Sequence, residues 1–493
     1  MARHKNRLLS KSRFISGLQC PRYLWVLAND PTRVPEPDAG TQFVFDQGHE
    51  VGNLAKKLFP GGIDIPSDDF VANLRMSREL LSSRRPLFEA AFMSDGKYAR
   101  VDILEPVGED MWHIIEVKSS TSVKDVHYPD VAFQRHCCEQ AGLTIDRCFL
   151  AHINGGYVRN GDIVPEELFE LVDITDDVAE LSGSVLSMSE EMLLMMAGLA
   201  CPEGLVGPHC TDPYDCPLQG ECWSFLPEDS VFTLYRIGRR AYGLLEAGIM
   251  SIAGLAADVQ LTREQEIQRA CLADGMPHVE PMAIHSFLRR LRYPVHYLDF
   301  ETIGTAIPLY DGVRPYQQVP FMFTVQVVRS PGAAPEQHAY LADPGNDPRP
   351  GLVAALRAAI GEEGSIVSFN APFELGVLRD LATAVPESRV WIESMCTRMV
   401  DLLIPFRGFN YYHPLQRGSA SLKRVLPALT VESYDGLAVP DGTAAGIAYL
   451  STLSDLPDAD VDRIRTDLIE YCSLDTRGMA CIVERLNELS QST

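Results

Sequence analysis

The chain has 493 residues, of which 46% are hydrophobic and 22% charged, and its formal net charge is −24. This length predicts two or three domains with real hydrophobic cores, and the composition is ordinary for a soluble globular protein. The acidic balance argues against a protein that coats nucleic acid non-specifically. It remains compatible with an enzyme whose acidic side chains hold cations against phosphate.

The amino terminus is basic, because residues 1–13 carry five Lys or Arg and no acid. We expect this segment to form an edge that contacts phosphate. No hydrophobic stretch follows, so it is not a secretory signal, and the longest apolar run, 192–200, is too short to span a bilayer. The sequence therefore predicts a cytoplasmic protein without a membrane partner. In such a chain, twelve cysteines favour metal ligation or core packing over disulfides.

Residues 10–60 favour helices. Ser10 can cap the first helix, and residues 44–59 have helical periodicity. His49 lies on this second helix, within Gly48-His49-Glu50. A helical histidine is more often a surface or core residue, but its place ahead of the acidic segment described next makes it a candidate metal ligand.

Residues 98–120 favour a β-hairpin, because two apolar, β-branched segments flank a turn with Pro, Gly and Asp. Asp102 lies on the first strand, and Glu116 and Lys118 share one face of the second. Pairing across the turn brings Asp102 close to that face. Two carboxylates and an ammonium can bind a divalent metal and orient a water beside a phosphate. On spacing alone, a surface ion pair explains the pattern equally well.

An Asp followed by a hairpin and Glu-x-Lys resembles the PD-(D/E)xK nuclease signature. Residues 10–225 resemble the RecB-like nucleases, including CRISPR-associated iron–sulfur members. The likeness includes Gly48-His49-Glu50, Gln134 on a predicted helix over 128–141, a strand over 147–153, and cysteines near both ends. It implies that His49, Asp102 and Glu116 hold Mg²⁺ or Mn²⁺, that Lys118 positions the attacking water and that Gln134 orients the site. Cys137 and Cys138 follow Gln134 where the family often has a tyrosine.

A cysteine-rich loop occupies residues 207–223, with Cys210, Cys216 and Cys222 at C-x5-C-x5-C spacing. Three cysteines do not complete a tetrahedral structural site, so a fourth ligand is needed. The resemblance implies that Cys20 joins the three around a [4Fe-4S] cluster. Zinc, with Cys201 or His209 as the fourth ligand, is the alternative. The other cysteines lie in regular helical or strand patterns and are expected to pack in cores: Cys137, Cys138, Cys148, Cys271, Cys396, Cys472 and Cys481.

Residues 234–281 have a helical pattern. Within them, residues 244–255 resemble a helix-hairpin-helix unit that turns at Gly248, although a plain helical connector fits equally well. The local basic patch consists of Arg236, Arg239 and Arg240.

A second acidic constellation begins at residue 293. Asp299 and Glu301 share one face of a predicted strand. Glu374 opens a helix after a strand at 366–369, and Tyr471 and Asp475 lie four apart on a late helix. Three acidic elements and a phenol can converge on a two-metal site for phosphodiester hydrolysis.

This order of motifs, over about residues 286–493, resembles the tyrosine subclass of the DEDD exonucleases on a ribonuclease-H-like fold. The resemblance implies that Asp299, Glu301, Glu374 and Asp475 bind metal and that Tyr471 orients the nucleophilic water. The second motif normally ends in Asp, and Glu374 is longer by one methylene, so Asp380 or Asp401 is an alternative ligand. An inactive, binding-only domain is a further alternative.

Together these patterns predict an α/β protein with three parts. A PD-(D/E)xK restriction-endonuclease-like domain covers 1–230, a helical connector 231–285, and a ribonuclease-H-like DEDD-type 3′→5′ exonuclease domain 286–493. The expected activity is metal-dependent hydrolysis of nucleic acid, with single-stranded DNA ends favoured and RNA possible. The alternative is a nucleic-acid-binding scaffold with one or both metal sites silent. Tyr411 and Tyr412 either stack on unpaired bases or cover the core.

Overall fold

The computed structural model of the protein describes residues 8–66, 68–454 and 456–491, and it divides into two compact units. The first unit comprises Met1–Phe225 and Thr305–Tyr316, and the second comprises Leu226–Gly304 and Gln317–Thr493. The segment expected to be a connector, 231–285, lies within the second unit. Part of the basic amino-terminal edge, Arg3, Lys5 and Arg7, falls outside the described residues.

The first unit contains a mixed sheet with strand order β2-β3-β4-β5-β6-β7, and β1 pairs with the start of β4. β3, β4 and β5 form an antiparallel meander, β6 is parallel to β5, and β7 is antiparallel to β6. The predicted hairpin is the β4–β5 pair. The strands are β1 (Leu9–Ser10), β2 (Ile63–Asp64), β3 (Leu87–Ser94), β4 (Lys97–Val107), β5 (Met111–Lys118), β6 (Thr144–Ile153) and β7 (Phe169–Asp173).

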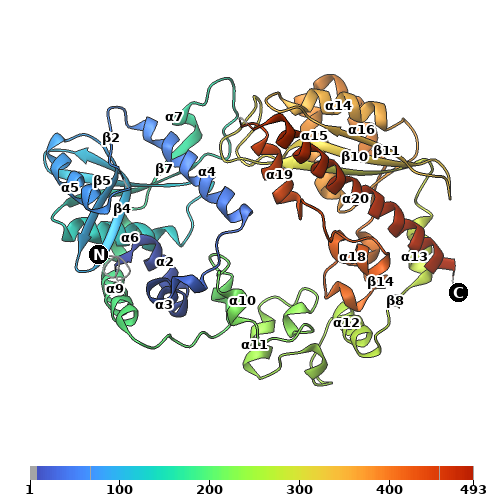
Figure 1. Ribbon diagram of the computed structural model, residues 1–493, viewed down its shortest axis with the longest axis horizontal. Coiled ribbons are helices and arrows are strands. Elements are labelled where there is room, and N and C mark those ends of the chain that lie inside the picture. The colour runs from blue at the N-terminus through green and yellow to red at the C-terminus, as the bar shows by residue number, and fades with distance from the viewer. Residues whose placement is uncertain (1–7, 67, 455, 492–493) are drawn as a thin grey trace. The chain divides into compact units, whose positions relative to one another are not determined.

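The helices of this unit include the early ones that the sequence predicts: α2 (Lys11–Gln19), α3 (Pro21–Asn29), α4 (Ala39–Ala55), α5 (Phe70–Leu80), α6 (His127–Gln140), α7 (Pro165–Leu168), α8 (Thr175–Glu180), α9 (Ser182–Ala197) and α10 (Gln219–Cys222). Ser10 caps α2 as expected, because its side chain accepts a hydrogen bond from the backbone N–H of Arg13. α6 packs against β3, β4 and β6, with α2 and α9 beside it (Figure 1). Phe14 of α2 stacks on Phe133 of α6 with 4.7 Å between ring centroids. This apolar contact fixes the start of α2 beside β5.

The second unit contains a mixed sheet with strand order β11-β10-β9-β12-β13. β9, β10 and β11 are antiparallel, and β12 and β13 run parallel to β9. The strands are β9 (Val295–Ile303), β10 (Val319–Val328), β11 (Glu336–Leu341), β12 (Ser365–Ser368) and β13 (Met399–Asp401), and a separate small pair joins β8 (His278–Val279) to β14 (Tyr411–Tyr412).

The two faces of this sheet are covered by different helices. Val295 and Tyr297 of β9 pack with residues of the long helix α20, whereas Leu298 and Phe300 pack with α14, α15 and α16. Because side chains alternate along a strand, Asp299 and Glu301 point to the α20 side. The helices are α11 (Arg240–Glu246), α12 (Arg263–Asp274), α13 (Pro281–Leu288), α14 (Pro348–Ala359), α15 (Ala371–Ala384), α16 (Arg389–Thr397), α17 (Ile404–Arg407), α18 (Leu422–Leu429), α19 (Gly442–Ser451) and α20 (Asp458–Gln491). α20 runs along β9 and β10 (Figure 1).

Two local expectations differ from the structure. After α11 the chain turns at Gly248, but only a 3₁₀ turn, Ile252–Gly254, follows, so the second helix of the expected hairpin unit does not form. Tyr411 and Tyr412 are 3% and 1% exposed, and the Tyr412 hydroxyl accepts a hydrogen bond from the backbone of Gly418. They cover the core, so the base-stacking alternative is wrong.

The architecture is mixed α/β, as the sequence predicts. Within residues 8–66, 68–454 and 456–491, every helix is too short or too polar to cross a membrane.

Candidate functional sites

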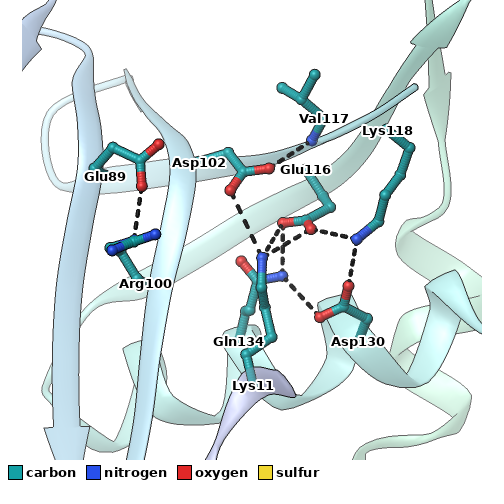
Figure 2. A network of polar contacts seen from close by, with 9 residues as sticks. All are labelled: Lys11, Glu89, Arg100, Asp102, Glu116, Val117, Lys118, Asp130 and Gln134. Carbon is teal, nitrogen blue, oxygen red and sulfur yellow. Dashed lines mark hydrogen bonds and ion pairs between the residues drawn. The ribbon is translucent and has the colours of Figure 1, made fainter. Parts of the chain in front are cut away.

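The first site is centred on Glu116, near the end of β5 (Figure 2). Its carboxylate is 1% exposed and accepts hydrogen bonds from Lys118 at 2.6 Å and from the Gln134 amide at 2.8 Å. Lys118 also reaches Asp130 at 2.6 Å, one turn before Gln134 on α6. The Glu-x-Lys spacing therefore places both side chains on the face of the sheet that α6 covers.

Asp102 lies where the β4–β5 ladder opens. Its carboxylate accepts a hydrogen bond of 2.9 Å from the Val117 N–H, next to the last ladder pair, Ile103 with Ile115. The ammonium of Lys11, the first residue of α2, lies 3.6 Å from this carboxylate and 2.8 and 3.0 Å from the two oxygens of Glu116. Figure 2 shows Lys11 reaching up between the two acids.

The charges of this cluster are mutually compensating. Burial alone would raise the pKa of Glu116, but the Lys11 and Lys118 ammonium groups outweigh it and hold the pKa below the ordinary value. Burial lowers the pKa of Lys118, but the surrounding carboxylates raise it by more. The net pKa is above the ordinary value, so this side chain is a charged ammonium. Burial and the nearby Glu116 carboxylate raise the pKa of Asp102 to about 7.

A cavity of about 1050 Å³ opens over these residues. Its walls include His49 of α4 and the cationic side chains of Lys56, Arg100 and Lys124. In the described part of the chain, no three ligand atoms from His49, Asp102 and Glu116 lie within 4.8 Å of one another. The structure thus brings Asp102, Glu116, Lys118 and Gln134 close together. His49 lines the cavity but does not form a compact ligand group with Asp102 and Glu116.

Glu89 of β3 borders the same cavity and has φ = 61° inside a strand. This is an uncommon conformation for a residue with a side chain and costs conformational energy. Its carboxylate pairs with Arg100 at 2.7 Å. The strained backbone lies one strand away from Asp102.

The second site gathers acids from β9 and α20. Asp299 and Glu301 of β9 and Cys472 of α20 each offer a ligand atom, and the three atoms lie within 4.8 Å of one another. Asp475 lies one turn beyond Tyr471 on α20 and accepts a hydrogen bond from the Tyr434 hydroxyl. Asp299, Tyr471 and Asp475 line one cavity of about 560 Å³.

These acids are held in a setting that favours their neutral forms. Burial, together with the Asp475, Glu301 and Glu374 carboxylates, raises the pKa of Asp299 well above its ordinary value. Burial and the Asp475 carboxylate raise the pKa of Glu301 to about 8. Burial raises the pKa of Asp475 to about 6, although the hydrogen bond from Tyr434 and the charge of Lys423 lower this pKa. A divalent cation would relieve this repulsion.

Glu374 is the position at which the chain departs from the exonuclease pattern that it resembles. It lies in the first turn of α15, is 3% exposed, and one of its carboxylate oxygens has no hydrogen-bond partner. Burial raises its pKa to about 8. Its charge acts on Asp299, yet it is not among the residues that line the cavity.

The alternative acids for that position do not replace it. Asp401 accepts hydrogen bonds from the backbone N–H groups of Asn370 and Leu403, both 3.0 Å long, so it stabilises the ends of β12 and β13. Asp380 lies further along α15 and does not line the cavity. The cavity wall does include Lys423, whose ammonium is 5.6 Å from the ring centroids of Tyr434 and Tyr471.

The four cysteines predicted to bind a cofactor lie in one neighbourhood. Cys20, Cys210 and Cys222 all raise the pKa of Cys216, after the larger effect of burial. Across the residues that the structure describes, no three of these thiols lie within 4.8 Å of one another. A zinc ion with Zn–S bonds of about 2.3 Å requires sulfurs about 3.8 Å apart. The thiols of a [4Fe-4S] cluster bind different irons and lie farther apart than this.

Several site residues were missed by sequence reasoning. Lys11, Tyr434 and Cys472 come into their sites only through folding, and Cys472 was expected to be a packing residue. Asp130 carried a local signal, because it lies four residues before Gln134 and so shares its helix face.

Comparison with known proteins gives one family match. Residues 296–421 match a family described as "Domain of unknown function (DUF2779)". That segment contains Asp299, Glu301 and Glu374 but ends before Tyr471 and Asp475. No curated protein matches the chain.

Proposed function

We propose that the protein is a metal-dependent nuclease with two phosphodiesterase sites. The observation that carries the proposal is the convergence of Asp102, Glu116 and Lys118 in the lining of a cavity with basic walls, where Gln134 holds Glu116 from α6. Two carboxylates can bind Mg²⁺ or Mn²⁺, which lowers the pKa of a bound water and polarises a phosphoryl oxygen. Lys118, fixed by Glu116 and Asp130, positions the water and neutralises charge on the phosphate.

Topology supports a PD-(D/E)xK assignment for the first unit. An antiparallel meander is followed by a helix and then by a strand parallel to the last strand of the meander. In the second unit, antiparallel β9, β10 and β11 with parallel β12 and β13 support a ribonuclease-H-like assignment. The acids of β9 and α20 then correspond to a DEDD-type metal site, and the thiols of Cys20, Cys210, Cys216 and Cys222 to a [4Fe-4S] site.

The preferred substrate is nucleic acid with single-stranded ends. The first cavity is bordered by the exposed aromatic side chains of Phe45 and Tyr214 and by Lys56 and Lys124. Aromatic rings stack on unpaired bases, and ammonium groups follow the backbone. DNA and RNA both offer these groups.

The test is cleavage of end-labelled single- and double-stranded DNA and RNA, with Mn²⁺ or with chelator. Glu116→Gln should abolish one activity and Asp299→Asn the other, so the double variant should be inert. If the double variant cleaves as fast as the parent, neither cluster is a nuclease site.

One observation favours a second candidate for the second unit, a binding module with a silent metal site. Glu374 is buried and lies outside the cavity lining, as does Glu301, so two acids of the expected metal-binding set are not open to this cavity. In that case Asp299→Asn leaves cleavage unchanged, while Arg407→Ala, in the cavity wall, weakens binding of labelled single strands.

A further inference from the structure

The ammonium of Lys11 occupies the point between the two carboxylates that the proposed function assigns to a metal. It lies 2.8 and 3.0 Å from the oxygens of Glu116 and 3.6 Å from Asp102. Lys11 is far away in sequence, and α2 brings it to the site through the packing of Phe14 on Phe133. The side chain is therefore held there by the core of the first unit.

A divalent cation bound by both Asp102 and Glu116 has to lie near the same oxygens. Lys11 and the metal are both positive, and two cations within a few ångströms repel strongly in a partly buried site. They cannot share the position. A metal can enter only if the Lys11 side chain, which is 25% exposed and so has a path outward, moves away.

We propose that Lys11 is a tethered counter-cation that holds the Asp102–Glu116 carboxylates in the metal-free protein and is displaced when a divalent cation binds. This inference rests on the proposed function of the first site. It makes Lys11 a positioning residue that keeps the acids in place at the cost of metal affinity. Once displaced, its ammonium remains tethered beside the cavity, where a substrate phosphate would lie.

A purely structural ion pair would behave differently. Removing a structural pair destabilises the protein equally with and without metal, and it leaves metal affinity unchanged or weaker. Removing a competing cation strengthens metal binding. Among the described residues it also leaves Asp102 without an ion pair and Glu116 with Lys118 alone, so the metal-free protein alone loses stability.

The experiment measures Mn²⁺ binding to the full-length protein through the electron paramagnetic resonance signal of free Mn²⁺. All variants carry Asp299→Asn and Asp475→Asn, which silence the second site. Lys11→Met is compared with this background and with Lys124→Met. Lys124 lines the same cavity with the same charge but, among the described residues, makes no ion pair with either acid.

We expect Lys11→Met to bind Mn²⁺ about tenfold more tightly than the background and Lys124→Met to stay within about twofold. The melting temperature of Lys11→Met should fall in chelator and recover with Mn²⁺. Lys11→Arg, which keeps the charge and can bind a carboxylate through two N–H groups, should bind Mn²⁺ no better than the background. This second variant keeps the test decisive if Lys11→Met does not fold.

Equal or weaker Mn²⁺ binding by Lys11→Met overturns the role of Lys11, as does tighter binding by Lys11→Arg. A further variant, Glu116→Gln, separates this failure from failure of the proposed function. If Glu116→Gln leaves the Mn²⁺ binding of the background unchanged, the first site does not bind metal. The proposed function of the first site and the role of Lys11 then both fall. If Glu116→Gln removes Mn²⁺ binding but Lys11→Met does not strengthen it, only the role of Lys11 falls.

Discussion

Glu374 offers a test in which a substitution should stabilise the protein. The side chain is 3% exposed and has an oxygen without a hydrogen-bond partner, and burial raises its pKa from 4.5 to about 8. Between these values the folded unit holds a proton that the unfolded chain has released. Stability therefore falls as the pH rises from about 4.5 to about 8.

The magnitude follows from the displacement of the pKa. One pKa unit corresponds to about 1.4 kcal/mol, and the pKa of Glu374 rises from 4.5 to about 8 on folding. Above pH 8, where Glu374 is ionised, the folded unit is therefore roughly 5 kcal/mol less stable than it would be with a carboxyl of unshifted pKa. Glu374→Gln keeps the size of the side chain and cannot ionise. In chelator we expect the variant to be more stable than the parent at about pH 8.5 and nearly equal to it at about pH 5.

The assay is pulse-labelling hydrogen exchange along a urea gradient, read from peptides that cover β9 and α15, because this isolates the second unit. Glu387→Gln is the matched control, since Glu387 is an exposed acid just after α15. With Mn²⁺, the parent should regain stability and Glu374→Gln should not, if the carboxylate joins the metal site. Equal pH dependence of parent and variant in chelator would refute the reasoning, because it would mean that Glu374 ionises freely while buried.

Three further predictions concern individual side chains of the two acidic sites and of the cysteine cluster. Tyr434→Phe removes a hydrogen bond that lowers the pKa of Asp475, so the pH midpoint of Mn²⁺ binding to the second site should rise by about one pH unit. An unchanged midpoint in a pH series of binding isotherms contradicts this. Cys20→Ser should remove iron and the broad visible absorbance of a cluster, while Cys271→Ser retains both; iron analysis decides. Lys118→Met should slow first-site cleavage about 100-fold in single-turnover assays while Mn²⁺ binding is retained, and an unaltered rate would exclude the positioning role.

The first site was predictable where its residues are close in sequence. Glu116 and Lys118 share a strand face by simple alternation, and the turn at 108–110 fixes their hairpin partner. Asp130 and Gln134 share a helix face in the same way. Lys11 was not predictable, because it is separated from Glu116 by 105 positions and reaches it through tertiary packing.

The second site shows the same limit. The strand spacing of Asp299 and Glu301 and the helical spacing of Tyr471 and Asp475 identified the two elements, but not the partner Tyr434 from a loop. Alternation also left open whether Tyr411 and Tyr412 face solvent or core, because aromatic rings suit both. Nothing in the sequence indicated that residues 305–316 belong to the first unit, where Ala306 donates a hydrogen bond to Gln47.

The two clusters hold their acids in opposite ways when no metal is bound. In the first, ammonium groups of Lys11 and Lys118 compensate Glu116, whose pKa stays low. In the second, burial keeps protons on the carboxyls, with pKa values of about 8 for Glu301 and about 6 for Asp475. A metal therefore has to displace a tethered ammonium and one proton, that of Asp102 with its pKa of about 7, in the first site, and the protons of several carboxyls, including Asp299 and Glu301, in the second. Because only proton release depends directly on pH, metal affinity should rise more steeply with pH in the second site, and this difference allows each site's contribution to cleavage to be separated without mutation.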